Sequence, residues 1–382
     1  MGLTYVLAAV AILQGIFTLI DGLRTARYTR SYRPGRAAAD RRVVVFCPCK
    51  GTDEEFDQNV RSILSQDYPD YEVQFIVESE KDEAYSILRK LGGNVLVAGR
   101  ASDRGQKVHN LAFAVSRRKD AEIYVFCDSD ARFPHDWLSH LLAPLDLSNI
   151  TTGYRWYVAR RFHFPTLMRS AWNASSASIL GDHDRNFAWG GSTALYRETF
   201  ERLGIMDAWR GSISDDYAIT RTAQRKRTKI VFVPECFIPS YGECSFGELL
   251  EFTTRQVIIT RVYHPGLWRV GFIGHAIFNL AFWMLPFFHP WLWQGLWLVI
   301  YVLSAARCWI RYSAVRTALP DPGLSSDAGW FYILSSPLVA LLYLYNMVAS
   351  ALRTEIVWRQ IHYKLVSPNE TRVFGGSRAS ES

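Results

Sequence analysis

The stretch FCDSDAR, residues 126–132, contains the two carboxylates of this sequence that are best suited to chemistry. Asp128 and Asp130 flank Ser129 directly after the apolar, β-prone residues 123–127. Mg²⁺ and Mn²⁺ prefer carboxylate oxygens, and Mg²⁺ usually takes one or two protein carboxylates together with substrate phosphates. The pair could therefore hold a metal that bridges to a diphosphate and neutralises a leaving group. For an isolated Asp-x-Asp, the alternative is a solvated turn or a helix cap.

Three further groups of acidic residues allow two interpretations each. Asp215 and Asp216, in SISDDYA, stand at an expected helix start, where they could be a cap and a first-turn acid, or one could be a general base for an acceptor hydroxyl. Asp82 follows an expected strand and could accept hydrogen bonds from a base or ribose, or be a charge favoured at a helix N-terminus. The DHD triplet at 182–184 matches no standard metal motif and is interpreted as a polar loop.

The elements that must position these residues alternate between strand and helix. The patterns predict strands over 43–47, 71–79, 94–99 and 121–127, with helices over 53–66, 82–92 and 107–118 between them. This alternation predicts an α/β fold with a mainly parallel sheet, in which ligands bind at the carboxyl ends of the strands. Lys50 and Lys107 lie in two loops at that edge, where they could offset phosphate charge or simply be surface lysines. The sequence lacks the glycine patterns of dinucleotide and P-loop sites.

Three uncharged, apolar stretches predict an integral, multi-pass membrane protein. Residues 2–20 and 328–352 are each long enough for one pass, and residues 270–306 for two, with a turn at His289–Pro290. Residues 24–42 hold seven arginines and one aspartate, which places the following domain in the cytoplasm by the positive-inside bias. Three passes after that domain would leave the tail outside, whereas the arginines and lysine of the tail favour the inside. The expected domains are an anchor at 1–23, a cytoplasmic domain at 40–255, and an interfacial segment, two to three membrane helices and a basic tail at 256–382.

The composition excludes some classes of function. Much of the net charge of +7 comes from arginines that flank the first apolar stretch, so nucleic acid is not an expected partner. None of the six cysteines forms a CxxC pair, which fits a reducing compartment without structural disulfides.

Taken in order, these motifs resemble the ceramide glucosyltransferase-like group of membrane-bound GT-A glycosyltransferases. The resemblance covers nearly the whole chain, through PCKGTDEEF, QDYP, GQKVHNL, CDSDAR, GGSTALYRE, SDDYA and WRQIHYKL. It implies a Rossmann-like, nucleotide-sugar-binding GT-A domain joined to transmembrane helices. It also implies a role for each matched residue: Lys50, Gly51 and Asp82 around uridine diphosphate, Asp128 and Asp130 on the metal and diphosphate, and Asp216 as the catalytic base beside Asp215.

One motif of the resembled group is altered in this sequence. Lipid-active relatives carry (Gln/Arg)-x-x-Arg-Trp on an interfacial helix. Here Arg255 matches the first position, but Ile258 and Ile259 stand where Arg-Trp is expected. Arg261, in the next turn, could supply the missing cation to the donor diphosphate.

The resemblance implies inverting, Mg²⁺- or Mn²⁺-dependent transfer of glucose or N-acetylglucosamine from a UDP-sugar to the hydroxyl of a membrane lipid such as ceramide. The expected partners are the UDP-sugar, the lipid acceptor and the bilayer itself. Two alternatives remain at this stage: a processive polysaccharide synthase, and a non-catalytic membrane protein that only binds nucleotide.

Overall fold

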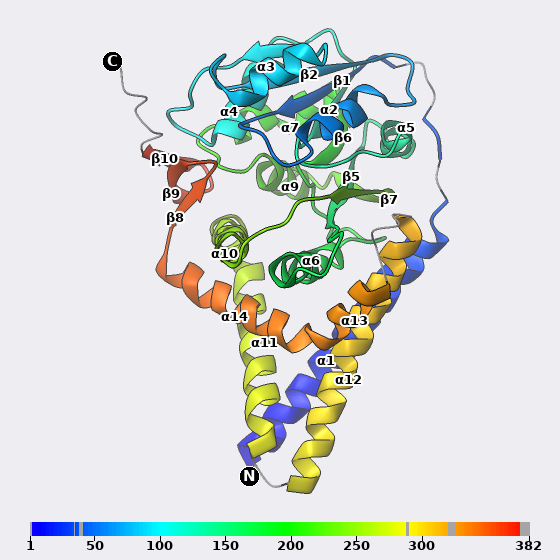
Figure 1. Cartoon of the computed structure of the whole chain (residues 1–382), viewed down its shortest axis with the longest axis vertical. Helices are drawn as coiled ribbons and strands as arrows, with labels where there is room; N and C mark the ends of the chain where they lie inside the picture. The colour runs from blue at the N-terminus through cyan, green and yellow to red at the C-terminus, as the bar shows by residue number, and fades with distance from the viewer. Residues whose placement is uncertain (1, 34, 38–40, 288–289, 320–325, 375–382) are drawn as a thin grey trace. The chain divides into compact units, whose positions relative to one another are not determined.

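A seven-stranded mixed sheet is the largest element of the protein (Figure 1). The structure, a computed structural model, describes residues 2–33, 35–37, 41–287, 290–319 and 326–374. Strands β3, β2, β1 and β4 are parallel neighbours, and β6 runs antiparallel to both β4 and β5. This arrangement confirms the predicted α/β, GT-A-type fold class with a parallel first half. In the sheet order the strands are β3 (Asn94–Val97), β2 (Tyr71–Val77), β1 (Val43–Pro48), β4 (Ile123–Cys127), β6 (Ser192–Tyr196), β5 (Asn149–Tyr157) and β7 (Lys229–Ser240).

Strands β1 and β4 are apolar along their length, which allows them to lie in the centre of the sheet. Residues 43–47 and 123–127 are buried, as expected for parallel strands that are covered on both faces. The predicted helices between the strands are present, and Phe56, Val60 and Ile63 face the core as their spacing predicts. The helices of this part of the chain are α2 (Phe56–Leu64), α3 (Glu83–Lys90), α4 (Gln106–Val115), α5 (Trp137–Leu142), α7 (Arg197–Leu203), α8 (Ile205–Ala208) and α9 (Asp215–Arg225).

An aromatic cluster fixes the start of α9 beside the end of β4. The rings of Phe126, Phe200 and Trp209 pack edge to face or tilted, with centroids 5.3 to 6.4 Å apart. Buried aromatic pairs of this kind contribute beyond the area that they remove from water. The indole nitrogen of Trp209 also donates to the backbone oxygen of Asp215 at 3.2 Å. The apolar core therefore sets the position of the residues that begin α9.

The chain divides into two compact units. One consists of residues 1–32, 157–181 and 243–353, and the other of residues 33–156, 182–242 and 354–382. The units therefore interleave along the chain, whereas the predicted domains are continuous ranges. The predicted boundaries at 23, 40 and 255 stay a prediction, and residue 40 lies outside the described residues.

The first unit is helical and includes three helices that are long and apolar enough to cross a bilayer. These candidate spans cover Thr4–Ser31, Pro265–Phe287 and Trp293–Ala318, which fits an N-terminal anchor and two passes over 270–306. The turn predicted at His289–Pro290 lies partly outside the described residues, since the description resumes at Pro290. The helices of the unit are α1 (Gly2–Ser31), α6 (Phe164–Ala177), α10 (Phe246–Tyr263), α11 (Pro265–Met284), η1 (Leu285–Phe287), α12 (Pro290–Ala318), α13 (Ser326–Leu334) and α14 (Ser336–Leu352).

The stretch 328–352, which was expected as a single pass, is not one continuous helix. This stretch is divided into α13, of 9 residues, and α14, of 17 residues, and neither is among the candidate spans. A helix needs about 20 apolar residues to cross a bilayer. Pro337 stands in the first turn of α14, where its missing N–H costs nothing, so it favours a new helix over the continuation of α13.

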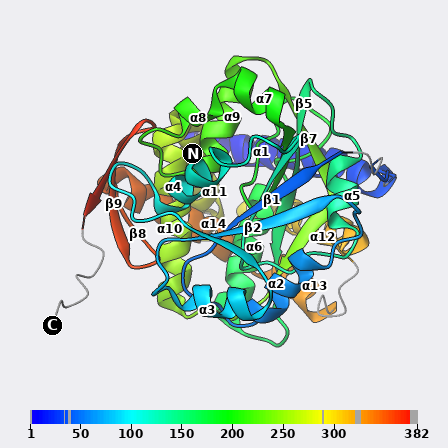
Figure 2. The same cartoon turned by 90° about the horizontal axis from the view of Figure 1, so that it is seen from above.

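The end of the chain returns to the unit that contains the large sheet. Strands β8 (Glu355–Trp358), β9 (Ile361–Ser367) and β10 (Glu370–Phe374) form an antiparallel sheet, which Figure 2 shows in red beside α4. The backbone N–H of Gln106, at the start of α4, donates to the Tyr363 hydroxyl at 3.2 Å. Both sheets belong to one unit, so we expect them on the same side of a bilayer, with an even number of passes between them. Two passes, over the candidate spans of α11 and α12, would satisfy this expectation.

We expect labelling of single cysteines to reveal this even number of passes. In sealed vesicles, an impermeant maleimide should reach Asn369→Cys, in the exposed β9–β10 turn, from the side of the large sheet. It should reach Phe287→Cys, at the exposed end of the second candidate span, only from the opposite side. Labelling of both from the same side would contradict the two-span arrangement.

Candidate functional site

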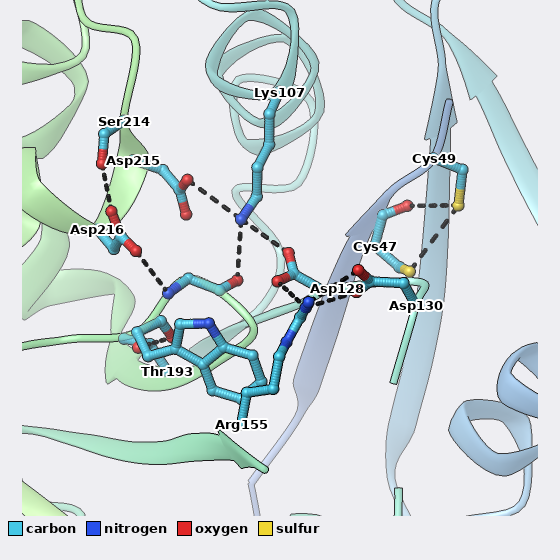
Figure 3. Close-up of polar contacts among 12 residues, drawn as sticks. Cys47, Cys49, Lys107, Asp128, Asp130, Arg155, Thr193, Ser214, Asp215 and Asp216 are labelled. Carbon is cyan, nitrogen blue, oxygen red and sulfur yellow. Dashed lines mark hydrogen bonds and ion pairs between the residues drawn. The ribbon is translucent and has the colours of Figure 1, made fainter. Parts of the chain in front are cut away.

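The ammonium group of Lys107 joins two of the acidic motifs (Figure 3). Its Nζ lies 2.8 Å from Asp128 Oδ1 and 3.2 Å from Asp215 Oδ1, and it donates to the backbone oxygen of Gly190 at 3.3 Å. Burial opposes the charge of Lys107, but the nearby carboxylates outweigh it and raise the pKa of this lysine above its ordinary value. Lys107 is therefore a buried structural cation of the site rather than a surface lysine.

The position of Lys107 follows from how α4 begins. Gly105 precedes the helix, and its N–H donates to Ser212 O at 2.9 Å in the segment that leads to α9. A side chain at Gly105 would approach the backbone oxygen of Ile213 to 2.7 Å, so only glycine allows this contact. The first turn of α4 thus lies directly against the segment that carries the second acidic pair.

Asp215 and Asp216 begin α9, as the sequence predicts, but they have different surroundings. The Asp215 side chain is 3% exposed, and burial raises the pKa of this carboxyl to about 6 although the charge of Lys107 acts in the opposite direction. Asp216 is only partly buried. Its Oδ1 accepts from the hydroxyl of Ser214 and from the backbone N–H of Tyr217, and its Oδ2 accepts from the backbone N–H of Gly190 at 3.4 Å.

The paired glycines of the WGGS stretch leave room for these carboxylates. A methyl group at Gly190 would overlap Asp215 Oδ2 and lie 2.8 Å from Lys107 Nζ. Asp215 Oδ2 is buried and has no hydrogen-bond partner within the described residues. The close approach of a backbone to a carboxylate therefore depends on glycine at this position.

Asp128 and Asp130 lie at the carboxyl end of β4, and Arg155 of β5 bridges them (Figure 3). Arg155 Nη2 lies 2.9 Å from Asp128 Oδ2 and 2.5 Å from Asp130 Oδ1, and Nη1 lies 2.8 Å from Asp130 Oδ2. Burial disfavours the charge of Asp130, but Arg155 outweighs burial and holds the pKa of this carboxyl below its ordinary value. Sequence reasoning missed Arg155, although a lone arginine inside the otherwise apolar and aromatic pattern of GYRWY could have signalled it.

The Asp128 and Asp130 pair fits a metal whose other ligands come from outside the protein. Within the described residues no group of three or more His, Cys, Asp or Glu side chains could hold an ion. Two carboxylates with substrate phosphates are nevertheless a usual set for Mg²⁺, and each carboxylate oxygen keeps a second lone pair beside its bond to Lys107 or Arg155. Asp215 and Asp216 add two negative charges that these two cations do not balance. The chemistry of the donor set is therefore compatible with a divalent ion.

Lys50, Gly51 and Asp82 form a second cluster at the ends of β1 and β2. The Lys50 ammonium lies 2.6 Å from Glu78, which also pairs with Arg100 at 2.9 Å. Asp82 Oδ1 accepts from the backbone N–H groups of Gly51 and Ala84, at 2.9 and 3.0 Å. Asp82 is therefore the N-cap of α3 and also fastens the loop after β1, in which Gly51 has a φ of 63°. The structure brings all three predicted residues together around this loop.

A second missed residue, Arg359, reaches the same loop from the end of the chain. It occupies the turn between β8 and β9 with a φ of 48°, and its Nη2 lies 2.5 Å from Asp53 Oδ2. The charge of Arg359 also acts on the pKa of Asp130, so the two groups lie within electrostatic reach. The signal was available in the WRQIHYKL motif, but only the tertiary structure shows what this segment approaches.

Arg255 and Arg261 belong to α10 in the other compact unit. Arg255 pairs with Glu251 at 3.3 Å, one turn earlier. Arg261 donates to the backbone oxygens of Ala351 and Arg353, at 3.0 and 2.8 Å, and so caps the end of α14. The structure therefore gives both arginines local partners, and their predicted contact with the donor diphosphate stays a prediction.

Comparison with known proteins identifies the class and then the family of this chain. Ligands of open α/β sheets bind at the carboxyl ends of the strands, where these carboxylates and cations lie. The sequence profile of glycosyl transferase family 21 matches residues 3–371. The chain belongs to this family, and it is a glycosyltransferase.

Two solved structures illustrate what the chain is similar to. A mannosyltransferase from Pyrobaculum calidifontis, in complex with GDP-mannose and Mn²⁺, shares 17% identity with a TM-score of 0.49, over 91% of this chain and 98% of its own. Glucosyl-3-phosphoglycerate synthase from Mycobacterium tuberculosis, in complex with Mn²⁺ and UDP-glucose, shares 16% identity with a TM-score of 0.38, over 61% of this chain and 84% of its own.

We expect Gly190→Ala to destabilise the protein, because the added methyl group overlaps Asp215 Oδ2 and crowds Lys107. Overpacking of this kind typically costs about 1–3 kcal/mol. Thermal unfolding in detergent should give a lower Tm for Gly190→Ala than for wild type. The matched control is Gly247→Ala, where the new methyl group meets only Ser245 Oγ at 4.0 Å. Equal Tm values for the two variants would contradict this account of the site.

Proposed function

We propose that this glycosyltransferase moves glucose or N-acetylglucosamine from a UDP-sugar to the hydroxyl of a membrane lipid such as ceramide, with inversion at the anomeric carbon. The observation that carries the proposal is the Lys107 bridge. It holds the Asp128–Asp130 pair, suited to a diphosphate, next to the Asp215–Asp216 pair, suited to taking a proton from an acceptor. Departure of the leaving group and activation of the acceptor are thus served from one small region.

Cations around Asp128 and Asp130 would stabilise the departing diphosphate. Preorganised positive groups that face a developing negative charge are often the largest contribution to catalysis. Lys107 and Arg155 lie at the carboxylates, and Arg359 lies nearby on the β8–β9 turn. Asp128 and Asp130 would hold Mg²⁺ or Mn²⁺, which when bound supplies further neutralisation of the diphosphate.

Asp216 is the proposed general base, and Asp215 its buried neighbour. A base must reach the substrate, and Asp216 is partly exposed whereas Asp215 is almost fully buried. Oδ1 of Asp216 is engaged by Ser214 and Tyr217, whereas Oδ2 accepts the long 3.4 Å contact from the N–H of Gly190. Oδ2 is therefore the atom that would accept the proton of the acceptor hydroxyl. A single displacement from the opposite face of the sugar then inverts its configuration.

The cluster around the loop after β1 is the proposed site for the nucleotide. Lys50 and Gly51 lie on this loop, and Asp82 fastens it. Arg359 contacts the same loop through Asp53, so it is suited to bind the donor diphosphate. Ile258 and Ile259 of α10 stand where the resembled group carries Arg-Trp and cannot supply a cation to the diphosphate. We assign this role to Arg359.

The helical unit supports a lipid acceptor and an integral membrane location. Many apolar side chains of α1, α11 and α12 are exposed, among them Leu13, Phe17, Val270 and Val302. Exposed apolar surface of this extent on helices of membrane-spanning length indicates contact with lipid. The arginines of residues 24–42 favour a cytoplasmic location for the sheet. An amphiphilic acceptor would then stay in the bilayer and present its hydroxyl at the cytoplasmic face.

We expect purified protein in lipid vesicles to transfer label from one of a panel of radiolabelled UDP-sugars to a discrete lipid band on thin-layer chromatography. Asp216→Asn should lower the rate by about 10²–10⁴-fold, the usual contribution of a general base. Asp130→Ala should also abolish most transfer, because the divalent ion would lose one of the two carboxylates proposed to hold it.

The panel distinguishes the proposal from its alternatives. Label that stays at the origin as polymer would instead support a polysaccharide synthase. Normal turnover by a folded Asp216→Asn protein would rule out Asp216 as the base. UDP binding without transfer to any acceptor would contradict the proposed activity.

We expect Arg359→Ala to raise the KM for the UDP-sugar by about tenfold, because charge-assisted contacts to phosphate are worth more than about 1.4 kcal/mol. Initial rates over a range of donor concentrations give this value. Arg372→Ala is the matched control, since Arg372 belongs to the same small sheet but pairs only locally, with Glu370. A KM unchanged from wild type in Arg359→Ala would remove this residue from the donor site.

A further inference from the structure

Arg155 and Lys107 together engage every carboxylate oxygen of Asp128 and Asp130. Its guanidinium contacts three of the four carboxylate oxygens, and Lys107 contacts the fourth. The Arg155 side chain is 10% exposed, and its guanidinium carbon lies 5.3 Å from the centre of the Trp189 ring. Salt bridges in such a buried position are screened little by solvent and have good bidentate geometry.

The charges around Arg155 do not balance. Four carboxylates, those of Asp128, Asp130, Asp215 and Asp216, face Lys107 and Arg155. The third cation within reach, Arg359, is itself paired with Asp53. The site therefore attracts further positive charge, yet the guanidinium lies across the oxygens that would coordinate it. A divalent ion that approaches these oxygens must either share them with Arg155, against like-charge repulsion, or displace the guanidinium.

We propose that Arg155 is a positioning residue that makes metal binding at Asp128 and Asp130 depend on the donor. Without a donor, the guanidinium competes with a divalent ion for the same carboxylate oxygens. A nucleoside diphosphate offers the guanidinium a new bidentate anionic partner, because arginine matches phosphate as well as carboxylate. Arg155 then turns from the carboxylates to the phosphates, and the ion and the donor bind together.

This inference rests on the proposed function only for its second half. The competition between Arg155 and a divalent ion follows from the geometry of the site alone. The release of Arg155 by the donor requires in addition that the donor carries a uridine diphosphate. The two halves are measured separately, so the failure of one is distinguishable from the failure of the other.

Mn²⁺ binding to the full-length protein in detergent, followed by the loss of the free Mn²⁺ signal in electron paramagnetic resonance, tests both halves. Wild type should bind Mn²⁺ weakly alone and about tenfold or more tightly when UDP is present. Arg155→Gln should bind Mn²⁺ alone about tenfold or more tightly than wild type, because no ion-paired hydrogen bonds must first be broken. UDP should improve its Mn²⁺ binding less than in wild type. Arg155→Lys, which restores the charge, should lie closer to wild type.

Two controls assign the signal to this site. Arg210→Gln removes an exposed arginine of the same unit, paired only with Asp207 on the surface, and should leave Mn²⁺ binding unchanged. Adding Asp130→Asn to Arg155→Gln should remove the tight binding. Near-ultraviolet circular dichroism verifies that each variant is folded.

Three results would overturn the proposal. They are tight Mn²⁺ binding by wild type without UDP, equal Mn²⁺ affinities of wild type and Arg155→Gln, and absence of Mn²⁺ binding by every form with or without UDP. Tight binding by Arg155→Gln together with no effect of UDP on wild type would keep the competition but refute release by the donor. In that case a panel of other nucleoside diphosphates would show whether only the identity of the donor is wrong.

Discussion

The structure depends on one buried cation, the ammonium group of Lys107. Removing one partner of a buried ion pair leaves an uncompensated charge and typically costs about 3–5 kcal/mol. Lys107 has two such partners, Asp128 at the end of β4 and Asp215 at the start of α9, and it extends from the first turn of α4. The consecutive elements α4 and β4 and the distant α9 therefore stabilise one another at this point.

Around this cation, two positively charged side chains offset the repulsion between four carboxylates. Four carboxylates lie close together, which would be unfavourable without Lys107 and Arg155 between them. Burial, together with the neighbouring carboxylates, raises the pKa of Asp215, while Arg155 holds the pKa of Asp130 below its ordinary value, so the two carboxyls differ in their readiness to take a proton. Environments that separate the pKa values of neighbouring acids are typical of catalytic sites. The proposed function uses this separation, since it assigns one acidic pair to the leaving group and the other to the acceptor.

The segments of the two compact units alternate along the chain. The helical unit draws its segments from the start, the middle and the later part of the chain, and the last residues return to the unit of the large sheet. This return brings Arg359 to the loop after β1. Under the proposed function, the small sheet of the tail therefore bears on the charge at the proposed donor site and on the number of membrane passes before it. Neither follows from the tail sequence read alone.

The sequence by itself determined the α/β class, the strand ends that carry Asp128 and Asp130, the helix start at Asp215 and Asp216, and the apolar stretches of α1, α11 and α12. These features are local, since alternation, helical spacing and apolar length are properties of neighbouring residues. The tertiary structure alone decided that Lys107 is a buried bridge, that Arg155 covers the Asp-x-Asp pair, that Arg359 reaches Asp53, and that residues 328–352 form two helices. The first three are contacts between residues 21 to 306 positions apart. Arg155 on β5 reaches the end of β4 although β6 lies between these strands, and the sequence does not specify that order. Such contacts depend on how distant parts of the chain pack together, and the pattern of neighbouring residues does not specify that packing.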